Sequence, residues 1–252
     1  MKILIDTKRN AIKINNKSIS IFSKKSFECI SELWNKLGWN QKYSYTFTWL
    51  GRPIIQVPED IVRFQELIFR LKPNKIVETG IAHGGTAILF ASILDQINNK
   101  GKVLAIDIKI RKKNLKAIKK HSLYRYIKLF EGSSIDLNIF RKVKKNIRPN
   151  DKVFVFLDSN HTYEHVYNEL MLYSKIVSKN SYIVACDGVM SLVNDTPRGK
   201  KYWKRDNPIK AIKKFLKNNK NFILDEPVWL FNESKLNKRI THSPLCFLKK
   251  IR

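Results

Sequence analysis

Acidic residues are scarce in this chain of 252 residues. Asp and Glu together number 21 against 49 Lys and Arg, which gives a formal charge of +28. Such a charge favours a polyanionic partner, such as nucleic acid, an acidic glycan or an anionic membrane surface. Compositional bias is the alternative, because Lys, Asn and Ile are abundant along the whole chain and the lysines are dispersed. The sequence contains no nucleic-acid-binding signature, so nucleic acid is not an expected partner.

Long apolar runs and cysteine pairs are also missing. The first residues contain no stretch suited to a signal peptide, and the longest apolar window, 81–94, is too short to cross a bilayer. Cys29, Cys186 and Cys246 form no C-x-x-C pair, so reduced thiols are expected rather than zinc or disulfides. We expect a cytoplasmic protein without a transmembrane segment. Peripheral contact with an anionic membrane and self-association are both left open.

Short β-rich runs alternate with helical patterns from residue 58 onward. Strands are expected at 75–79, 103–108, 127–130, 153–157 and 182–185, with a closing antiparallel pair at 222–230 and 245–248. Helices are expected at 58–71, 85–98, 112–121, 136–145, 162–177 and 208–217, with a turn at 98–101. This alternation predicts an α/β fold with a mostly parallel central sheet, helices on both faces and an antiparallel C-terminal strand.

Residues 1–57 are interpreted as a helical and aromatic extension that precedes an α/β domain of residues 58–252. A helix at 26–37 has apolar residues at helical spacing, with Gly38 as its C-cap. The segment 43–53 is dense in aromatic residues, so it either packs on the domain as a cap or lid, or lines a substrate pocket. A loop at 190–207 carries Tyr202 and Trp203, which could stack on a substrate.

The stretch 76–90 combines a strand, a turn with three glycines and an apolar helix. Glycines let the backbone approach a ligand closely, and a helix N-terminus offers free N–H groups, as in nucleotide-type cofactor sites. The dinucleotide pattern G-x-G-x-x-G is absent, and Glu78 would repel a pyrophosphate. S-adenosylmethionine, which has an amino group and no phosphate, fits better, with Gly80 and Gly84 in its loop. A plain strand-to-helix turn is the alternative.

Polar residues follow five consecutive strands at the edge where an open α/β sheet binds ligands. They are Glu78 with Gly80, Asp107, Ser133 with Ser134, Asp158 with His161, and Asp187. A single acid at such a position could be a helix cap or turn former, but five together are hard to explain by capping.

Two groups of these residues suggest different roles. Asp107 is placed to accept hydrogen bonds from ribose hydroxyls, and Ser133 and Ser134 could hold an adenine edge, although Ser134 could instead cap the next helix. Asp158 and Asp187 end adjacent strands, and such carboxylate pairs suit Mg²⁺ or Ca²⁺, which could activate a substrate hydroxyl. His161 could accept the hydroxyl proton. Its alternative is a helix-end or cofactor-stacking histidine.

The strings IVETGIAHGGTAILFAS, VLAIDIKIR, EGSSID and FLDSNHTYEHVYNEL resemble the cephalosporin hydroxylase / rhamnosyl O-methyltransferase family over about residues 43–220. The resemblance implies an S-adenosylmethionine-dependent O-methyltransferase with a Rossmann-like class I fold. It implies divalent-metal ligands at Asp158 and Asp187, with a third from a neighbour. Carried over position by position, it also implies cofactor contacts at Glu78, Gly80, His83, Asp107, Ser134 and Asp158.

The metal site departs from the pattern of that family. Related sites commonly have an acid or amide beside the second Asp, whereas Cys186 and Gly188 flank Asp187, so Asn160 is the candidate third ligand. No 2-His-1-carboxylate triad is apparent, which favours methyl transfer over hydroxylation. We expect methylation of a sugar hydroxyl in a glycan or glycosylated natural product, assisted by Mg²⁺ or another divalent cation. Alternatives are a small aromatic or β-lactam-like acceptor, a basic nucleic-acid-binding methyltransferase, and a cofactor-binding scaffold without catalysis.

Overall fold

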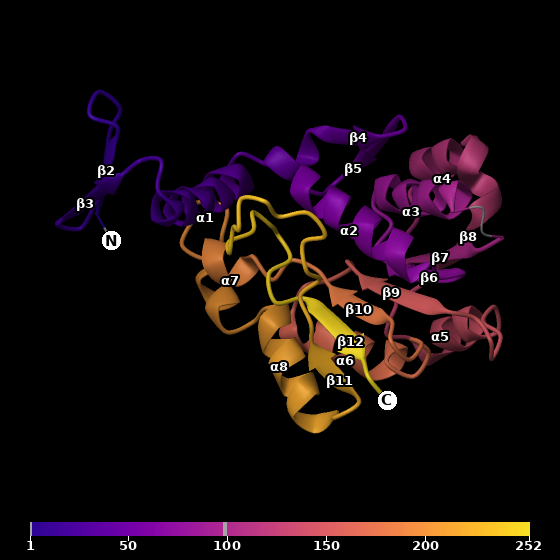
Figure 1. Ribbon diagram of the computed structural model, residues 1–252. Helices are drawn as coiled ribbons and strands as arrows, with labels where there is room; N and C mark the ends of the chain where they lie inside the picture. Colours follow the sequence, from indigo (N-terminus) through magenta and orange to yellow (C-terminus); the bar gives the residue numbers. More distant parts are fainter. Residues whose placement is uncertain (1, 98–99) are drawn as a thin grey trace.

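A seven-stranded sheet forms the centre of the protein, in the computed structural model that describes residues 2–97 and 100–252 (Figure 1). Its order is β11-β12-β10-β9-β6-β7-β8. The parallel strands are β6 (Lys75–Thr79), β7 (Lys102–Asp107), β8 (Ile127–Glu131), β9 (Val153–Leu157) and β10 (Tyr182–Ala185). β12 (Phe247–Lys250) runs antiparallel between β10 and β11 (Phe222–Leu224). The predicted mostly parallel sheet with an antiparallel C-terminal strand is confirmed.

Helices cover both faces of the sheet (Figure 1). One face carries α2 (Pro58–Leu71), α3 (Gly85–Gln96) and α4 (Lys112–Lys119), and the other carries α5 (Leu137–Lys144), α6 (Tyr163–Tyr173) and α8 (Pro208–Asn218). Because both faces are covered, the central strands β9 and β10 are buried at every residue, and their sequences VFVFL and YIVA are continuously apolar. These runs explain why the sheet could be predicted.

Several predicted boundaries were wrong. α6 ends at Tyr173 rather than 177, because the N–H of Ile176 bonds back only three residues, to Tyr173, in a tight turn. The last two strands are 222–224 and 247–250, shorter or shifted relative to 222–230 and 245–248. The predicted loop at 190–207 contains α7 (Met190–Val193) and a 3₁₀ turn, η3 (Lys201–Lys204). Another 3₁₀ turn, η2 (Ser122–Tyr126), precedes β8. Residues 98–99 of the predicted helix end and turn lie outside the described residues.

The N-terminal segment is not only helical and aromatic. It begins with a three-stranded antiparallel sheet of β1 (Ile3–Asp6), β2 (Ala11–Ile14) and β3 (Lys17–Ser20), which the sequence analysis did not predict. In Figure 1 this sheet projects away from the central domain. α1 (Lys24–Asn40) is longer than predicted. Gly38 lies within the helix, packed against Tyr43 of the following turn, and the C-cap is Gln41.

The aromatic segment folds onto the α/β core. After a 3₁₀ turn, η1 (Tyr43–Tyr45), the strands β4 (Phe47–Trp49) and β5 (Arg52–Ile54) form a hairpin. The indole N–H of Trp49 donates a 3.0 Å hydrogen bond to Ser92 Oγ of α3. At Gly85 a Cβ would lie 2.2 Å from the carbonyl oxygen of Pro53, so α3 begins in direct contact with the β5 backbone. The division of the chain at residue 57 stays a prediction.

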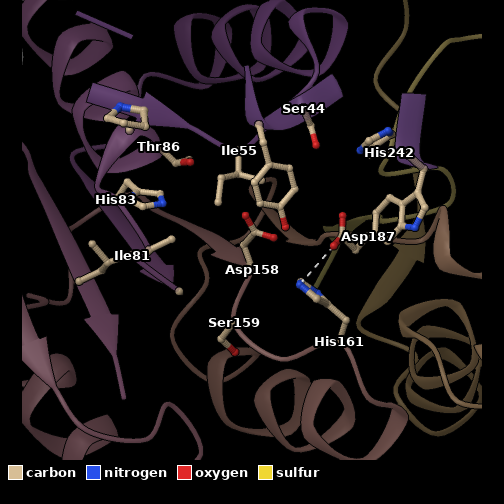
Figure 2. A pocket seen from close by; sticks show the side chains of 16 residues that line it. Ser44, Ile55, Ile81, His83, Thr86, Asp158, Ser159, His161, Asp187 and His242 are labelled. Carbon is tan, nitrogen blue, oxygen red and sulfur yellow. Dashed lines mark ion pairs between the residues drawn. The ribbon is translucent and has the colours of Figure 1, made fainter. Parts of the chain in front are cut away.

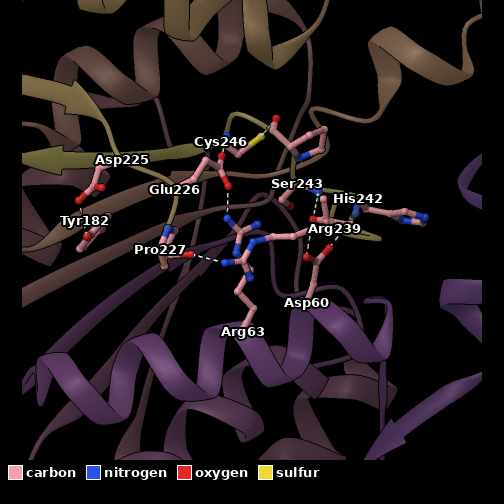
Figure 3. Close-up of polar contacts among 12 residues, drawn as sticks. Asp60, Arg63, Tyr182, Asp225, Glu226, Pro227, Arg239, His242, Ser243 and Cys246 are labelled. Atoms are coloured by element: carbon pink, nitrogen blue, oxygen red, sulfur yellow. Dashed lines mark hydrogen bonds and ion pairs between the residues drawn. The ribbon is translucent and has the colours of Figure 1, made fainter. Parts of the chain in front are cut away.

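A C-terminal segment, residues 225–246, crosses over α2 before β12 and is tied down by polar contacts (Figure 3). The buried carboxylate of Asp60 accepts hydrogen bonds from the Thr241 hydroxyl and, at 2.8 Å, from the His242 N–H. Arg63 pairs with Glu226, and Arg239 donates to the Pro227 carbonyl. Because α2 holds this segment, His242 is fixed at the edge of the sheet. Among the residues that the structure describes, no helix is both long and apolar enough to span a membrane.

Candidate active site

A cavity of about 210 Å³ lies at the carboxyl ends of β6, β9 and β10 (Figure 2). We call it the acidic cavity. Asp158 and Asp187 line it from the strand ends, and His161 lines it from the loop before α6. The opposite wall comes from the N-terminal part of the chain: Trp39, Ser44, Tyr45, Pro53 and Ile55. The aromatic segment therefore both packs on the domain and lines this cavity, and its role as a cap or substrate lid stays a prediction.

Asp158, His161 and Asp187 face one another in this cavity (Figure 2). One ligand atom from each lies within 4.8 Å of the others, and His161 Nε2 is 3.2 Å from Asp187 Oδ2. Asp187 occupies the left-handed region, with φ of 61°, a conformation that costs free energy in a non-glycine residue and often marks functional sites. The sequence predicted that these three side chains converge, and they do.

The carboxyl of Asp158 is held in an electrostatically unfavourable position. Burial raises its pKa well above the usual range, and the nearby carboxylates of Asp187, Glu78 and Glu169 raise it further. The amide of Gln56 opposes this by donating a 3.0 Å hydrogen bond to Oδ2. In the described part of the chain, no Lys or Arg forms an ion pair with Asp158 or Asp187.

This donor set fits a divalent cation. Two carboxylates and an imidazole whose ligand atoms lie this close together can coordinate one ion, and a cation would relieve the repulsion between the carboxylates. Asn160 lines the neighbouring cavity, and its side-chain oxygen accepts a 3.0 Å hydrogen bond from the Thr162 N–H. The role of Asn160 as a metal ligand stays a prediction.

A second cavity, of about 540 Å³, adjoins the first, since Gly80, Ser159 and His161 line both. We call it the Asp107 cavity. Four residues predicted to bind a cofactor meet there: Gly80, Asp107, Ser133 and Ser134. At Gly80, with φ of 88°, a Cβ would lie 2.0 Å from the Asp158 carbonyl oxygen, so only glycine lets the loop pass this close to the end of β9.

Asp107 ties the end of β7 to the glycine loop. Its Oδ2 accepts hydrogen bonds from the N–H groups of Ile81, at 2.9 Å, and Ala82, at 3.1 Å. Ser134 does not cap α5, because Asp136 is the N-cap. Instead, Ser134 Oγ lies 3.0 Å from His165 Nε2, which is also 3.1 Å from Ser159 Oγ. Ser134 therefore belongs to a polar network that lines the cavity.

Three other predicted cofactor contacts are placed differently. Glu78 is fully buried and lines neither cavity; within the described chain neither of its carboxylate oxygens has a hydrogen-bond partner. Burial, followed by the charge of Asp107, raises its pKa well above the usual range. Gly84 is the N-cap of α3 and also lines neither cavity, whereas His83 lines the acidic cavity. The cofactor contacts of all three stay predictions.

Sequence reasoning missed Gln56, which supports Asp158 from behind the acidic cavity, and His242, which lines that cavity. The side-chain amide of Gln56 donates a hydrogen bond to Asp158, and the His242 ring lies against Trp39 with centroids 5.6 Å apart. Burial lowers the pKa of His242, although Asp187 opposes the shift. Neither residue belongs to a periodic pattern or a strand end, so no local signal marks it. Tyr202 and Trp203, which were predicted to stack on a substrate, line neither cavity.

The fold and site define a class of protein. A Rossmann-like sheet of this order, a glycine loop after its first parallel strand and a polar cavity at the carboxyl ends form a class I methyltransferase fold. Comparison with known proteins then gives the family. The family model "Rhamnosyl O-methyltransferase/CmcI" matches residues 41–251, and the chain belongs to this family. The resemblance found in the sequence is confirmed.

Relatives show the same assignment. The chain is 33% identical over 143 residues to the rhamnosyl O-methyltransferase of Mycobacterium tuberculosis strain H37Rv, covering 56% of each protein. The chain thus matches little more than half the length of that relative. It is 28% identical over 162 residues to the enzyme of Mycobacterium leprae, covering 64% of this chain and 68% of the relative. A solved CmcI structure with Mg and SAM shares the fold, with a TM-score of 0.56 and 14% identity over 82% of this chain and 78% of that one.

Proposed function

We propose that this protein transfers the methyl group of S-adenosylmethionine to a hydroxyl of a sugar, in a glycan or a glycosylated natural product, with a divalent cation such as Mg²⁺ assisting. The observation that carries the proposal is the junction of the two cavities: the acidic cluster lies next to the Asp107 cavity, and Gly80, Ser159 and His161 line both. Family membership supports it, since the relatives are named rhamnosyl O-methyltransferases.

The Asp107 cavity would hold the methyl donor. The Asp107 carboxylate suits the ribose hydroxyls, and Ser133 and Ser134 lie where an adenine edge would find hydroxyl partners. Gly80 leaves room beside Asp158, so the reactive end of the donor can reach the acidic cavity. Glu78, His83 and Gly84, in or beside the glycine loop, would contact the methionine end of the donor.

The acidic cavity would bind the acceptor hydroxyl. Asp158 and Asp187 would hold the cation, which when bound lowers the pKa of a hydroxyl oxygen beside it. The acceptor oxygen forms a bond to the methyl carbon while the methyl–sulfur bond breaks, and the hydroxyl proton passes to the free imidazole of His161. Asp187, 3.2 Å from His161 Nε2, would stabilise the imidazolium. Holding the reactants in line would supply much of the rate.

The walls of the acidic cavity suit a sugar. Trp39 and Tyr45 offer aromatic surface, and Ser44 and His242 offer hydrogen-bonding groups. Burial keeps the pKa of His242 low, so its neutral ring can accept a hydrogen bond from a hydroxyl. The sugar or glycan acceptor is the partner that these features support. A second copy of the chain, peripheral contact with an anionic membrane and a cytoplasmic location remain predictions, and nucleic acid is not expected as a partner.

Label transfer tests this proposal. The protein is incubated with S-adenosylmethionine labelled in its methyl group, with Mg²⁺, and with a panel of rhamnosyl glycosides, other methyl glycosides and catechol. We expect label in a sugar methyl ether, identified by mass spectrometry after hydrolysis, and loss of transfer when EDTA is added. Transfer to catechol alone would replace the sugar with an aromatic acceptor. Binding of the donor without any transfer would favour a scaffold.

A further inference from the structure

Two successive carbonyl groups of the glycine loop are held by side chains from two other elements. Arg52, on β5, donates from both Nε and Nη2 to the carbonyl oxygen of His83, with Nε at 3.1 Å. Asn114, on α4, donates from Nδ2 to the carbonyl oxygen of Ala82 at 2.7 Å. The two side chains also contact each other, since Arg52 Nη2 lies 3.3 Å from Asn114 Oδ1. Together they form one connected unit around the loop.

Arg52 is partly buried, and its side-chain hydrogen bonds go to the glycine loop and to Asn114. Burial lowers the pKa of its guanidinium, and in the described part of the chain it forms no ion pair with a carboxylate. Removing a cation from water costs free energy unless hydrogen bonds compensate. The compensation here comes from the His83 carbonyl and from Asn114, whose side chain is itself buried.

The loop needs this support because its shape is strained. Ala82 has φ of 46°, in the left-handed region that residues with a Cβ avoid. The N–H groups of Ile81 and Ala82 both donate hydrogen bonds to Asp107 Oδ2. Because peptides are planar and trans, a carbonyl of Ala82 turned toward Asn114 turns the N–H of His83 the other way. Among the described residues, that N–H donates no hydrogen bond, and His83 lines the acidic cavity.

We propose that Arg52 and Asn114 act as positioning residues for the methyl donor: they clamp the glycine loop in its strained, donor-binding shape. This inference rests on the proposed function, since it takes S-adenosylmethionine to bind at that loop. Without the clamp, Ala82 relaxes toward ordinary backbone angles and donor affinity falls.

Calorimetric titration with S-adenosylhomocysteine tests the clamp without any acceptor. Arg52→Met and Asn114→Ala should each raise the Kd about tenfold, as expected for the loss of a hydrogen bond to a charged or buried group. Arg52→Lys should recover part of the affinity, because Lys keeps the charge but lacks the planar fork. Combining Arg52→Met with Asn114→Ala should give less than the product of the single effects, because both side chains hold the same loop.

Trp49→Phe is the matched control. It removes the hydrogen bond that ties the same hairpin to Ser92 without touching the loop, so its Kd should stay within about twofold of wild type. Equal effects of Trp49→Phe and Arg52→Met would overturn the clamp and leave Arg52 a role in hairpin stability alone. Unchanged Kd values in Arg52→Met and Asn114→Ala would also overturn it. If Arg52→Met does not fold, Asn114→Ala and Arg52→Lys decide. Failure of the wild type to bind S-adenosylhomocysteine would instead refute the proposed function.

Discussion

The side-chain amide of Gln56 lies 3.0 Å from Asp158 Oδ2 and donates a hydrogen bond to it. Gln56 is buried just before α2. Its hydrogen bond orients the carboxyl of Asp158, whose pKa is raised by burial. Gln56→Leu should leave Asp158 misoriented and harder to ionise. We expect kcat to fall about tenfold and the Mg²⁺ concentration for half-maximal activity to rise. Gln65→Leu, on α2, is the control, and equal losses in both variants would show a general effect on α2.

Replacing Asp187 should separate catalysis from donor binding. Asp187 lines the acidic cavity but not the Asp107 cavity. Asp187→Asn should lower methyl transfer about 100-fold, because a ligand and the partner of His161 are lost, while the Kd for S-adenosylhomocysteine changes little. Asp195→Asn, whose exposed carboxylate pairs with Lys36, should leave activity unchanged. Full activity of Asp187→Asn would remove the acidic cluster from the mechanism.

Asp60 should make stability depend on pH. Burial raises its pKa to about 6, above the 3.8 of an ordinary Asp. The folded state therefore binds a proton more tightly than the unfolded state. The resulting stabilisation is complete below pH 3.8 and is lost as pH rises through about 6. The free energy of unfolding of wild type, minus that of Asp60→Asn, should fall by up to about 3 kcal/mol between pH 4 and 7 in urea titrations.

Asp95→Asn provides the comparison of opposite sign. Hydrogen bonds from Tyr126 and then Arg125 lower the pKa of Asp95, so its stabilisation is present above the unfolded-state pKa and is lost as pH falls. The difference between wild type and Asp95→Asn should therefore rise with pH. If the Asp60→Asn difference stays flat across this range, burial of Asp60 does not perturb its titration as stated.

Two glycines with similar backbone angles should respond differently to alanine. Gly80 has φ of 88° and its Cβ would lie 2.0 Å from the Asp158 carbonyl oxygen, whereas Gly51 has φ of 81° with no atom within 4 Å. Gly51→Ala should lose only the strain of a left-handed alanine, about 1–2 kcal/mol of unfolding free energy. Gly80→Ala should lose more and also abolish S-adenosylhomocysteine binding. Equal losses in urea unfolding and retained binding would contradict the close approach.

The parts of the fold that could be predicted are those with a strong local signal. β9 and β10 are continuous apolar runs, and Pro58 begins α2 at a position where proline is favoured. The sheet of β1–β3 was not predicted, because its strands are only four residues long and largely exposed. Only Ile12 is buried there, so the pattern of alternating burial that marks a strand is missing.

The same contrast applies to the site. Four site residues could be predicted because each lies at or just after the end of a strand, and parallel strands end at one edge of the sheet: Gly80, Asp107, Asp158 and Asp187. Arg52, Gln56 and His242 reach the site from segments distant in sequence, and only tertiary contacts reveal them. A position near a strand end does not by itself place a side chain in a cavity: Glu78 lies one residue inside β6, and its side chain is buried.

A crystal structure with S-adenosylhomocysteine and Mn²⁺ tests the central claim most directly, since the claim is that the Asp107 cavity and the acidic cluster serve one methyl-transfer reaction. We expect the donor product in the Asp107 cavity, with its ribose hydroxyls on Asp107 and its sulfur directed toward the acidic cavity. Anomalous density for Mn²⁺ should lie among Asp158, His161 and Asp187. Product bound elsewhere, or Mn²⁺ absent from this cluster at saturating concentration, would contradict the account.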